Sequence, residues 1–305
     1  MSNAEDTWQL GWQEMTLDVP ISWTLAKVEG GLETGYLRLD GEMMPRLELR
    51  WGPSPRKRTD LSALVDDYLR QVRRMARKQK LPFEYKEKTK SFPAKGREVR
   101  YFILKTDFPS HIIISRCKQC GRVVLARILH EAGENVDSVV RKVFGSLRDH
   151  VSKGEALWSV FDLNFRLSSA YRNTSSKFRV GHVQLEFARG KEGLGVERFN
   201  FADEVLRNSD LQNWASYALR KLLRPMKSLV TEWCFRGEQG LKIIGSPRLW
   251  RRIVAFSLKR ERFLCLVWRC PESDRIYVVW QKARNVTEGE LVDIAKTIQC
   301  HSGAK

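Results

Sequence analysis

A Cys-x-x-Cys pair is the first feature of this sequence that could carry chemistry. Cys117 and Cys120 are followed by Gly121, an arrangement that resembles one half of a zinc knuckle. Structural zinc takes four ligands, usually from two such pairs. Cys300 and His301 could supply the missing two, but nothing in their spacing requires it. We therefore expect free thiols in a hairpin, with metal binding as the weaker alternative, and assign no cofactor.

No other group of residues has the spacing of a catalytic site. Asp66-Asp67 and Asp203-Glu204 fall in helical patterns, where adjacent residues point in different directions. The glycines at 190, 193 and 195 do not have the order of a phosphate-binding loop. Ligand or triad spacing is absent from all five histidines: His111, His130, His150, His182 and His301. The prediction is a non-enzymatic protein, and an enzyme with a site between the two halves of the chain is the alternative.

The charge of the chain is strongly unbalanced. The 305 residues include 54 Lys and Arg against 36 Asp and Glu, a formal charge of +18. Such an excess repels itself, and it is typical of proteins that bind phosphate or acidic partners. The hydrophobic fraction of 42% and the ten tryptophans exclude a disordered chain.

Nothing in the sequence indicates a membrane protein or a secreted one. No run approaches the roughly 18 apolar residues of a membrane helix. The start carries Glu5 and Asp6 instead of a basic and then apolar segment, and the six cysteines lack the dense spacing of secreted scaffolds. We expect a cytoplasmic protein.

The excess positive charge is concentrated in two windows. Residues 56–100 hold fifteen Lys and Arg against six Asp and Glu, and residues 220–262 hold twelve against three. The candidate binding residues of the first window are Arg70, Arg73, Arg74, Arg77, Lys78, Lys80, Lys86 and Lys88. Those of the second window are Arg220, Lys221, Arg224, Lys227, Arg248, Arg251 and Arg252.

These windows predict a nucleic-acid-associated protein, with structured or ribosomal RNA favoured over DNA. Arginine forks suit bidentate contact with phosphate. Trp250, Tyr85 and Phe83 could stack on bases, although such aromatic residues more often belong to a core. An adaptor that binds an acidic protein surface is the alternative. A solvated helix face, with cations near its C-terminus, would need no partner at all.

The two halves of the chain match each other at several points in the same order. Residues 17–21 match 161–165, and 35–39 match 181–185. Arg116-Cys117 and Arg269-Cys270 are each followed, after four residues, by Arg and two strand-forming residues. Ser273 stands where Cys120 would fall, so a second knuckle is absent. We interpret the chain as a tandem duplication, with domains at 1–152 and 153–305.

The apolar patterns give the elements that must position these residues. Strands are expected at 14–26, 34–40 and 45–51, a helix at 60–79 with Thr59 as its N-cap, strands at 83–91, 97–106, 111–117 and 122–130, and a helix at 136–149. The second half has a central helical region at 201–226, broken near 208–210 and stopped by Pro225, and a last helix that opens on a Thr287 capping box. The predicted fold class is α+β, with two copies of an antiparallel sheet packed by helices in the order β-β-β-α-β-β-β-β-α.

The first half resembles PsbP-like domains and their bacterial relatives. The resemblance rests on residues 19–23 (Val-Pro-Ile-Ser-Trp), the mid-chain amphipathic helix, residues 92–101 and the ending at 144–147 (Phe-Gly-Ser-Leu). The second half lacks the Pro-Ile-Ser-Trp element. Members of that fold serve unrelated roles, largely as binding modules, so the resemblance implies a fold and transfers no functional residue.

Overall fold

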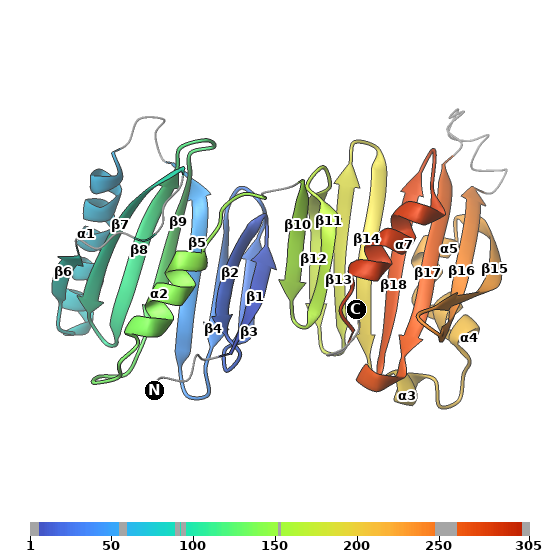
Figure 1. The fold of residues 1–305 in the computed structure, drawn as a ribbon, viewed down its shortest axis with the longest axis horizontal. Helices are drawn as coiled ribbons and strands as arrows, with labels where there is room; N and C mark the ends of the chain where they lie inside the picture. Colours follow the sequence, from blue (N-terminus) through green and yellow to red (C-terminus); the bar gives the residue numbers. More distant parts are fainter. Residues whose placement is uncertain are drawn as a thin grey trace. The chain divides into compact units, whose positions relative to one another are not determined.

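The chain folds as two units, each built largely of antiparallel strands. The computed structural model describes residues 6–54, 60–88, 92, 96–151, 154–247 and 261–300. The division falls between Met1–Val151 (unit 1) and Ser152–Lys305 (unit 2). Figure 1 gives the element labels, which are used from here on.

Unit 1 contains a seven-stranded antiparallel sheet and a separate hairpin. The sheet has the order β3-β4-β5-β9-β8-β7-β6. Its strands are β3 (Thr24–Gly30), β4 (Gly35–Asp40), β5 (Pro45–Pro53), β6 (Glu84–Lys88), β7 (Arg97–Lys105), β8 (Pro109–Cys117) and β9 (Arg122–Leu129). The hairpin is formed by β1 (Thr7–Trp12) and β2 (Met15–Pro20).

Two helices cover opposite faces of the unit 1 sheet (Figure 1). Helix α1 (Leu61–Gln79) packs on a core cluster that includes Phe102 of β7. Helix α2 (Asp137–Ser146) carries Phe144, whose ring meets that of Tyr101. Because adjacent residues of a strand point to opposite faces, Tyr101 and Phe102 place the two helices on different sides.

Unit 2 has the corresponding parts in its own sheet. The order is β12-β13-β14-β18-β17-β16-β15. The strands are β12 (Arg172–Arg179), β13 (His182–Arg189), β14 (Glu192–Asn200), β15 (Met226–Phe235), β16 (Glu238–Pro247), β17 (Arg262–Cys270) and β18 (Arg275–Ala283). A hairpin is formed by β10 (Glu155–Val160) and β11 (Leu163–Ser168). The helices are α3 (Ala202–Val205), α4 (Leu211–Ala218), α5 (Arg220–Leu223) and α7 (Glu288–Thr297), with a 3₁₀ turn at Pro271–Ser273.

The predicted fold class and strand order are wrong. The described residues are mostly antiparallel strand, and they place five strands, not three, before the first helix of each unit. The expected strand at 14–26 is in fact two strands, β2 and β3, because the N–H of Trp23 turns back onto the carbonyl of Pro20 at 3.0 Å. Strand β2 then pairs with β1, and β3 pairs with β4. Period-two alternation continues across such a turn, and it does not specify which partner a strand takes.

The helix boundaries also differ from those predicted. The predicted break near 208–210 is confirmed, since it separates α3 from α4, but α5 is a further short helix and Met226 already belongs to β15. The N-cap of α1 is Asp60, whose carboxylate accepts from the N–H of Ser62, while Thr59 lies outside the described residues. Thr287 is the N-cap of α7 but makes no side-chain capping bond, so the predicted capping box does not form. The remaining strands of the first half lie close to their predicted positions.

Candidate functional site

The helix-borne cations of unit 1 form an exposed group, which we call the α1 patch. Its members are Arg70, Arg73, Arg74, Arg77, Lys78 and Lys80, and all six are exposed. Arg70 forms an ion pair with Asp67. None of the other five forms an ion pair with a described residue. The patch extends to the C-terminal end of α1, where the helix dipole favours positive charge.

The positive charge does not continue along the following strand. Lys86 is exposed and Lys88 is half-buried on β6. On the same strand Glu84 pairs with Lys105 of β7 at 3.0 Å, and Glu87 approaches Arg100 at 3.7 Å. The surface of β6 is therefore of mixed charge, and within the described part of unit 1 the α1 patch is compact.

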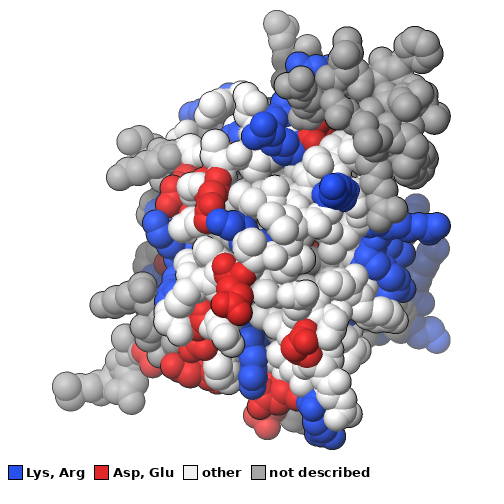
Figure 2. Space-filling model, turned by 90° about the vertical axis from the view of Figure 1, so that its right-hand side faces the viewer, with Lys and Arg blue, Asp and Glu red and all other residues white. Residues whose placement is uncertain are grey.

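A second group of cations, the α5 patch, lies on unit 2. It consists of Arg220, Lys221, Arg224 and Lys227, all exposed and without an ion pair to any described residue. The guanidinium of Arg220 lies 4.4 Å from the ring centroid of Tyr217. The predicted residues Arg248, Arg251 and Arg252 lie outside the described residues. Figure 2 shows blue side chains gathered along the right-hand margin of this end of the molecule, with red and blue mixed elsewhere on the face.

Of the three aromatic residues proposed to stack on bases, the two that are described, Tyr85 and Phe83, make contacts within unit 1. Tyr85 packs on the buried ring of Phe102, with ring centroids 5.4 Å apart. Phe83 is half-buried beneath the guanidinium of Arg73 at 4.8 Å, and Trp250 lies outside the described residues. The charge pattern of the sequence does not identify Tyr217, which is 70% exposed beside the α5 patch. Its position at the end of α4, one turn before Arg220, could have identified it.

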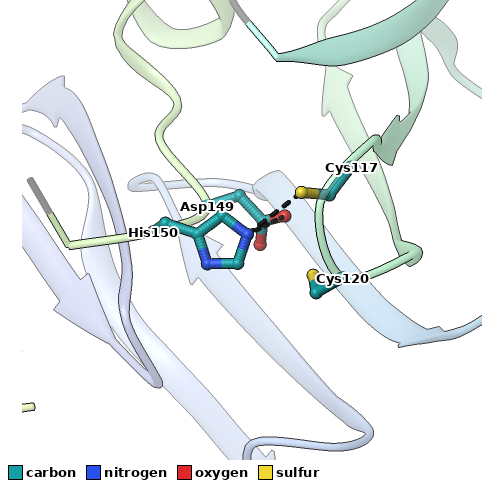
Figure 3. A group of neighbouring side chains, drawn as sticks. All are labelled: Cys117, Cys120, Asp149 and His150. Atoms are coloured by element: carbon teal, nitrogen blue, oxygen red, sulfur yellow. Dashed lines mark hydrogen bonds and ion pairs between the residues drawn. The ribbon is translucent and has the colours of Figure 1, made fainter.

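Figure 3 shows a cluster of ligand-type side chains in unit 1 that the sequence did not predict as a unit. Cys117 ends β8, Cys120 lies in the β8–β9 connection, and Asp149 and His150 follow α2. One ligand atom from each residue lies within 4.8 Å of every other. The sequence predicts the two cysteines as a weak metal candidate, with Cys300 and His301 as possible further ligands. Cys300 belongs to unit 2, and His301 lies outside the described residues.

The contacts within the cluster are close. The sulfur of Cys117 lies 3.0 Å from Nε2 of His150. The same nitrogen lies 4.0 Å from Oδ2 of Asp149. Oδ1 of Asp149 accepts a hydrogen bond from the buried guanidinium of Arg122 at 3.1 Å. Sulfur, imidazole and carboxylate therefore converge on one small volume.

A separate pocket of about 800 Å³ lies within unit 1, beside the N-terminal end of α2. Its lining includes Arg46 and Glu134, which pair at 2.6 Å. Burial would raise the pKa of Glu134, but the hydrogen bond from Arg46 and a backbone N–H hold it below its usual value. A carboxylate held ionised by an arginine is a poor general acid or base near neutral pH.

Among the described residues, none of the helices is long and apolar enough to cross a bilayer.

Comparison with known proteins gives only distant similarities. No family model and no curated protein matches the chain, so the resemblance to PsbP-like domains is not confirmed. The Saccharomyces cerevisiae Ran-binding protein Mog1p is 10% identical, covers 48% of this chain and 95% of its own, and gives a TM-score of 0.34. The Pseudomonas aeruginosa T6SS immunity protein TplEi, solved in complex with a peptide, is 10% identical over 96% of this chain and 97% of its own, with a TM-score of 0.32. The apo structure of TplEi gives 0.31. Similarities at this level assign neither a fold nor a function to the chain.

Proposed function

We propose that this chain is a non-enzymatic binding protein that docks an acidic protein partner through the α1 and α5 patches. The observation that carries the proposal is the exposure of ten helix- and strand-borne cations, of which Arg70 alone forms an ion pair with a described residue. Unneutralised like charges repel one another and cost stability. A partner of opposite charge removes that repulsion and is drawn to the surface at long range.

Exposed apolar side chains within the patches favour a protein partner over nucleic acid. Met75 is 57% exposed between the arginines of the α1 patch. Leu229 is 63% exposed on β15, on the same face of the strand as Lys227 because the two are two residues apart. Met, Tyr and Arg are enriched at the centres of protein interfaces. A phosphate backbone gives no reason to expose methionine or leucine.

The compact shape of the α1 patch points in the same direction. Helix α1 rises about 1.5 Å per residue, so Arg70 to Lys80 spans roughly 15 Å. The neighbouring strand β6 carries Glu84 and Glu87, which would repel a backbone of phosphates that continued past the helix. A short charged surface with an apolar centre fits an acidic peptide segment or a small protein epitope.

The test compares an acidic peptide that contains Leu and Phe with a short RNA duplex of the same net charge, using the full-length chain. We expect the peptide to bind more tightly. Reversing two charges, Arg74→Glu with Arg77→Glu, should weaken it by about tenfold or more, equivalent to at least about 1.4 kcal/mol. Met75→Ser should weaken the peptide and leave RNA binding unchanged, because only the peptide has apolar groups to bury.

Arg141 provides a matched control on α2, which covers the opposite face of the same sheet. It is an exposed helical arginine, like Arg74. Arg141→Glu should leave peptide binding unaltered, whereas Arg74→Glu should not. Tighter binding of the RNA duplex, with no response to Met75→Ser, would replace the protein partner with nucleic acid. Indifference of both probes to reversal of Arg74 and Arg77 would contradict any role for the patch.

A further inference from the structure

The cluster of Cys117, Cys120, Asp149 and His150 has features that free thiols in a hairpin do not need. The first is the hydrogen bonding of the sulfurs. The N–H of Gln119 points to the sulfur of Cys117 at 3.3 Å, and the N–H of Arg122 points to the sulfur of Cys120 at 3.5 Å. Each donor lies two residues after its cysteine. These N–H groups hold the two sulfurs, the atoms that would bind a metal, in fixed positions beside the cluster.

The second feature is an unpartnered oxygen on a buried carboxylate. The side chain of Asp149 is only 2% exposed. Its Oδ1 is bonded to Arg122, but its Oδ2 has no hydrogen-bond partner among the described residues. A buried acceptor left without a partner destabilises the fold, and a charged one does so more strongly. This oxygen faces the imidazole of His150, within the same group of ligand atoms.

The third feature is the supply of positive charge next to the cluster. Burial lowers the pKa of Arg97, while the charges of Asp149 and Cys117 act in the opposite direction. Arg122 is bonded directly to Asp149. A divalent cation held by two thiolates, one carboxylate and one neutral imidazole carries a net charge of −1. The neighbouring arginines neutralise that charge.

We propose that Cys117, Cys120, Asp149 and His150 bind a zinc ion. Zinc prefers sulfur and imidazole nitrogen, with carboxylate as an accepted ligand, in tetrahedral geometry. With bonds of about 2.0–2.3 Å, the ligand atoms of such a site lie roughly 3.3–3.8 Å apart. The four ligand atoms already lie within 4.8 Å of one another, so small side-chain movements suffice. Two Zn–S bonds form as the two thiols release their protons to solvent.

Four protein ligands make this a closed, structural site. It joins the β8–β9 connection to the segment that follows α2, two regions about 30 residues apart in the chain. Oδ1 of Asp149 keeps its bond to Arg122, which orients the carboxylate so that Oδ2 points to the metal. The zinc therefore fastens the end of unit 1 to its sheet.

The test measures metal content in the full-length chain purified under reducing conditions, by elemental mass spectrometry. We expect about one zinc per chain. Cys120→Ser, Asp149→Asn and His150→Phe should each lose it. Cys120 is exposed, so its serine variant tests binding without disturbing the core. Cys234→Ser, which changes an exposed cysteine on β15 of unit 2, is the matched control and should keep the metal.

Cobalt(II) in place of zinc provides a second readout that does not depend on stability. Sulfur-to-cobalt charge-transfer absorption and tetrahedral visible bands should appear in the wild type and in Cys234→Ser, and should be lost in Cys120→Ser. Three results would overturn the proposal: reduced wild type without zinc, zinc retained after Cys120→Ser and His150→Phe, or a Cys117–Cys120 disulfide in place of the metal.

Discussion

The segment after the last helix is held against the hairpin strands in both units, but the side chains that follow differ. In unit 1 a backbone bridge joins Arg148 to Thr16 of β2, and in unit 2 the corresponding bridge joins Gln299 to Asn164 of β11. The next residue is Asp149 in unit 1 and Cys300 in unit 2. The same point of the fold therefore carries a carboxylate in one unit and a thiol in the other.

The neighbouring strand connections differ in the same way. The β8–β9 and β17–β18 connections both join the fifth and fourth strands of their sheets. Unit 1 has Cys120 and Gly121 in a tight hairpin, with Gly121 at a φ of 75°. Unit 2 has the 3₁₀ turn Pro271–Ser273, with Ser273 in place of the second cysteine. Among the described residues, only unit 1 brings four ligating side chains together.

Unit 2 uses an arginine for the same purpose. Arg236, between β15 and β16, donates to the carbonyls of Lys296 and Ile298 at 2.7 and 3.1 Å, and to the sulfur of Cys300 at 3.5 Å. These bonds tie the end of α7 to the sheet without a metal. The segment after the last helix is therefore anchored in both units, by the hydrogen bonds of an arginine in unit 2 and by the proposed zinc site in unit 1.

The largest loss of stability should come from removing Arg122, and Arg236 provides the comparison in unit 2. Arg122→Ala leaves the buried carboxylate of Asp149 without its partner, and breaking a buried pair costs about 3–5 kcal/mol. Arg236 is exposed, so Arg236→Ala should cost only about 1–2 kcal/mol. Urea denaturation, with hydrogen exchange to identify which unit opens, measures both values.

Zinc binding should change the stability cost of Arg122→Ala but not that of Arg236→Ala. With zinc bound, the metal compensates the charge of Asp149, so Arg122→Ala should cost less than in chelator-treated protein. Arg236→Ala should cost the same with and without the chelator. Equal costs for Arg122→Ala under both conditions would argue against metal binding while leaving the buried ion pair intact as an explanation.

The sequence was sufficient for the local features of these regions and insufficient for their assembly. The hairpin at 118–121 follows from glycine at the turn position and strand patterns on both sides, and the structure confirms it. The exposure of the α1 patch follows from the spacing of its arginines opposite the apolar stripe. Asp149 and His150 could not be assigned to Cys117, because the path of the chain after α2 depends on a bridge to Thr16, more than 100 residues away.

The alternation of apolar residues also could not predict which strands pair with each other. A strand that reads 14–26 alternates whether or not it turns at Pro20, and only the pairing of β2 with β1 shows that it does. The carboxylates of β6 were visible, but their ion pairs with Lys105 and Arg100 depend on the register between β6 and β7. Charge counted along the sequence therefore overestimated the positive charge of the β6 surface.

A smaller effect is expected where each sheet packs a tryptophan over a glycine. Gly35 lies opposite Trp51, and Gly195 lies opposite Trp280, so that an added Cβ would collide with the indole. Alanine at either position should cost about 1–3 kcal/mol through overpacking. Gly35→Ala should be the more costly, because its Cβ also meets the backbone oxygen of Glu29 at 2.6 Å.

Glycines with open space around them provide the control for this pair. Gly145 of α2 and Gly289 of α7 have no atom within 4 Å of an added Cβ. Alanine there should be neutral or stabilising, by up to about 1 kcal/mol, because it favours the helix. Thermal unfolding of all four variants measures the difference. Both indoles are held by a hydrogen bond, Trp280 to Glu197 at 3.1 Å and Trp51 to the carbonyl of Gly31 at 2.8 Å, so a greater cost at Gly195 than at Gly35 would contradict the role of the Glu29 backbone.

The smallest effect near neutral pH should distinguish the units by acid sensitivity. Burial, and then the charge of His130, lowers the pKa of His111 to about 4. Its Nδ1 lies 2.5 Å from the hydroxyl of Tyr101, a contact that suits the neutral ring. At the same position of β17, the third residue of the strand, unit 2 has Leu264, which cannot titrate.

The sign follows from which state binds the proton. In the unfolded chain His111 takes up a proton below its ordinary pKa of about 6.5. In the folded chain the same ring stays neutral until the pH nears 4. The stability of unit 1 should therefore be complete above pH 6.5 and decrease as the pH falls from 6.5 toward 4. Urea denaturation at successive pH values, with hydrogen exchange to follow each unit, measures the slope. His111→Leu, which copies the residue of unit 2, should flatten that slope in unit 1 and leave unit 2 unchanged; an equal slope in the variant would show that other groups carry the acid sensitivity.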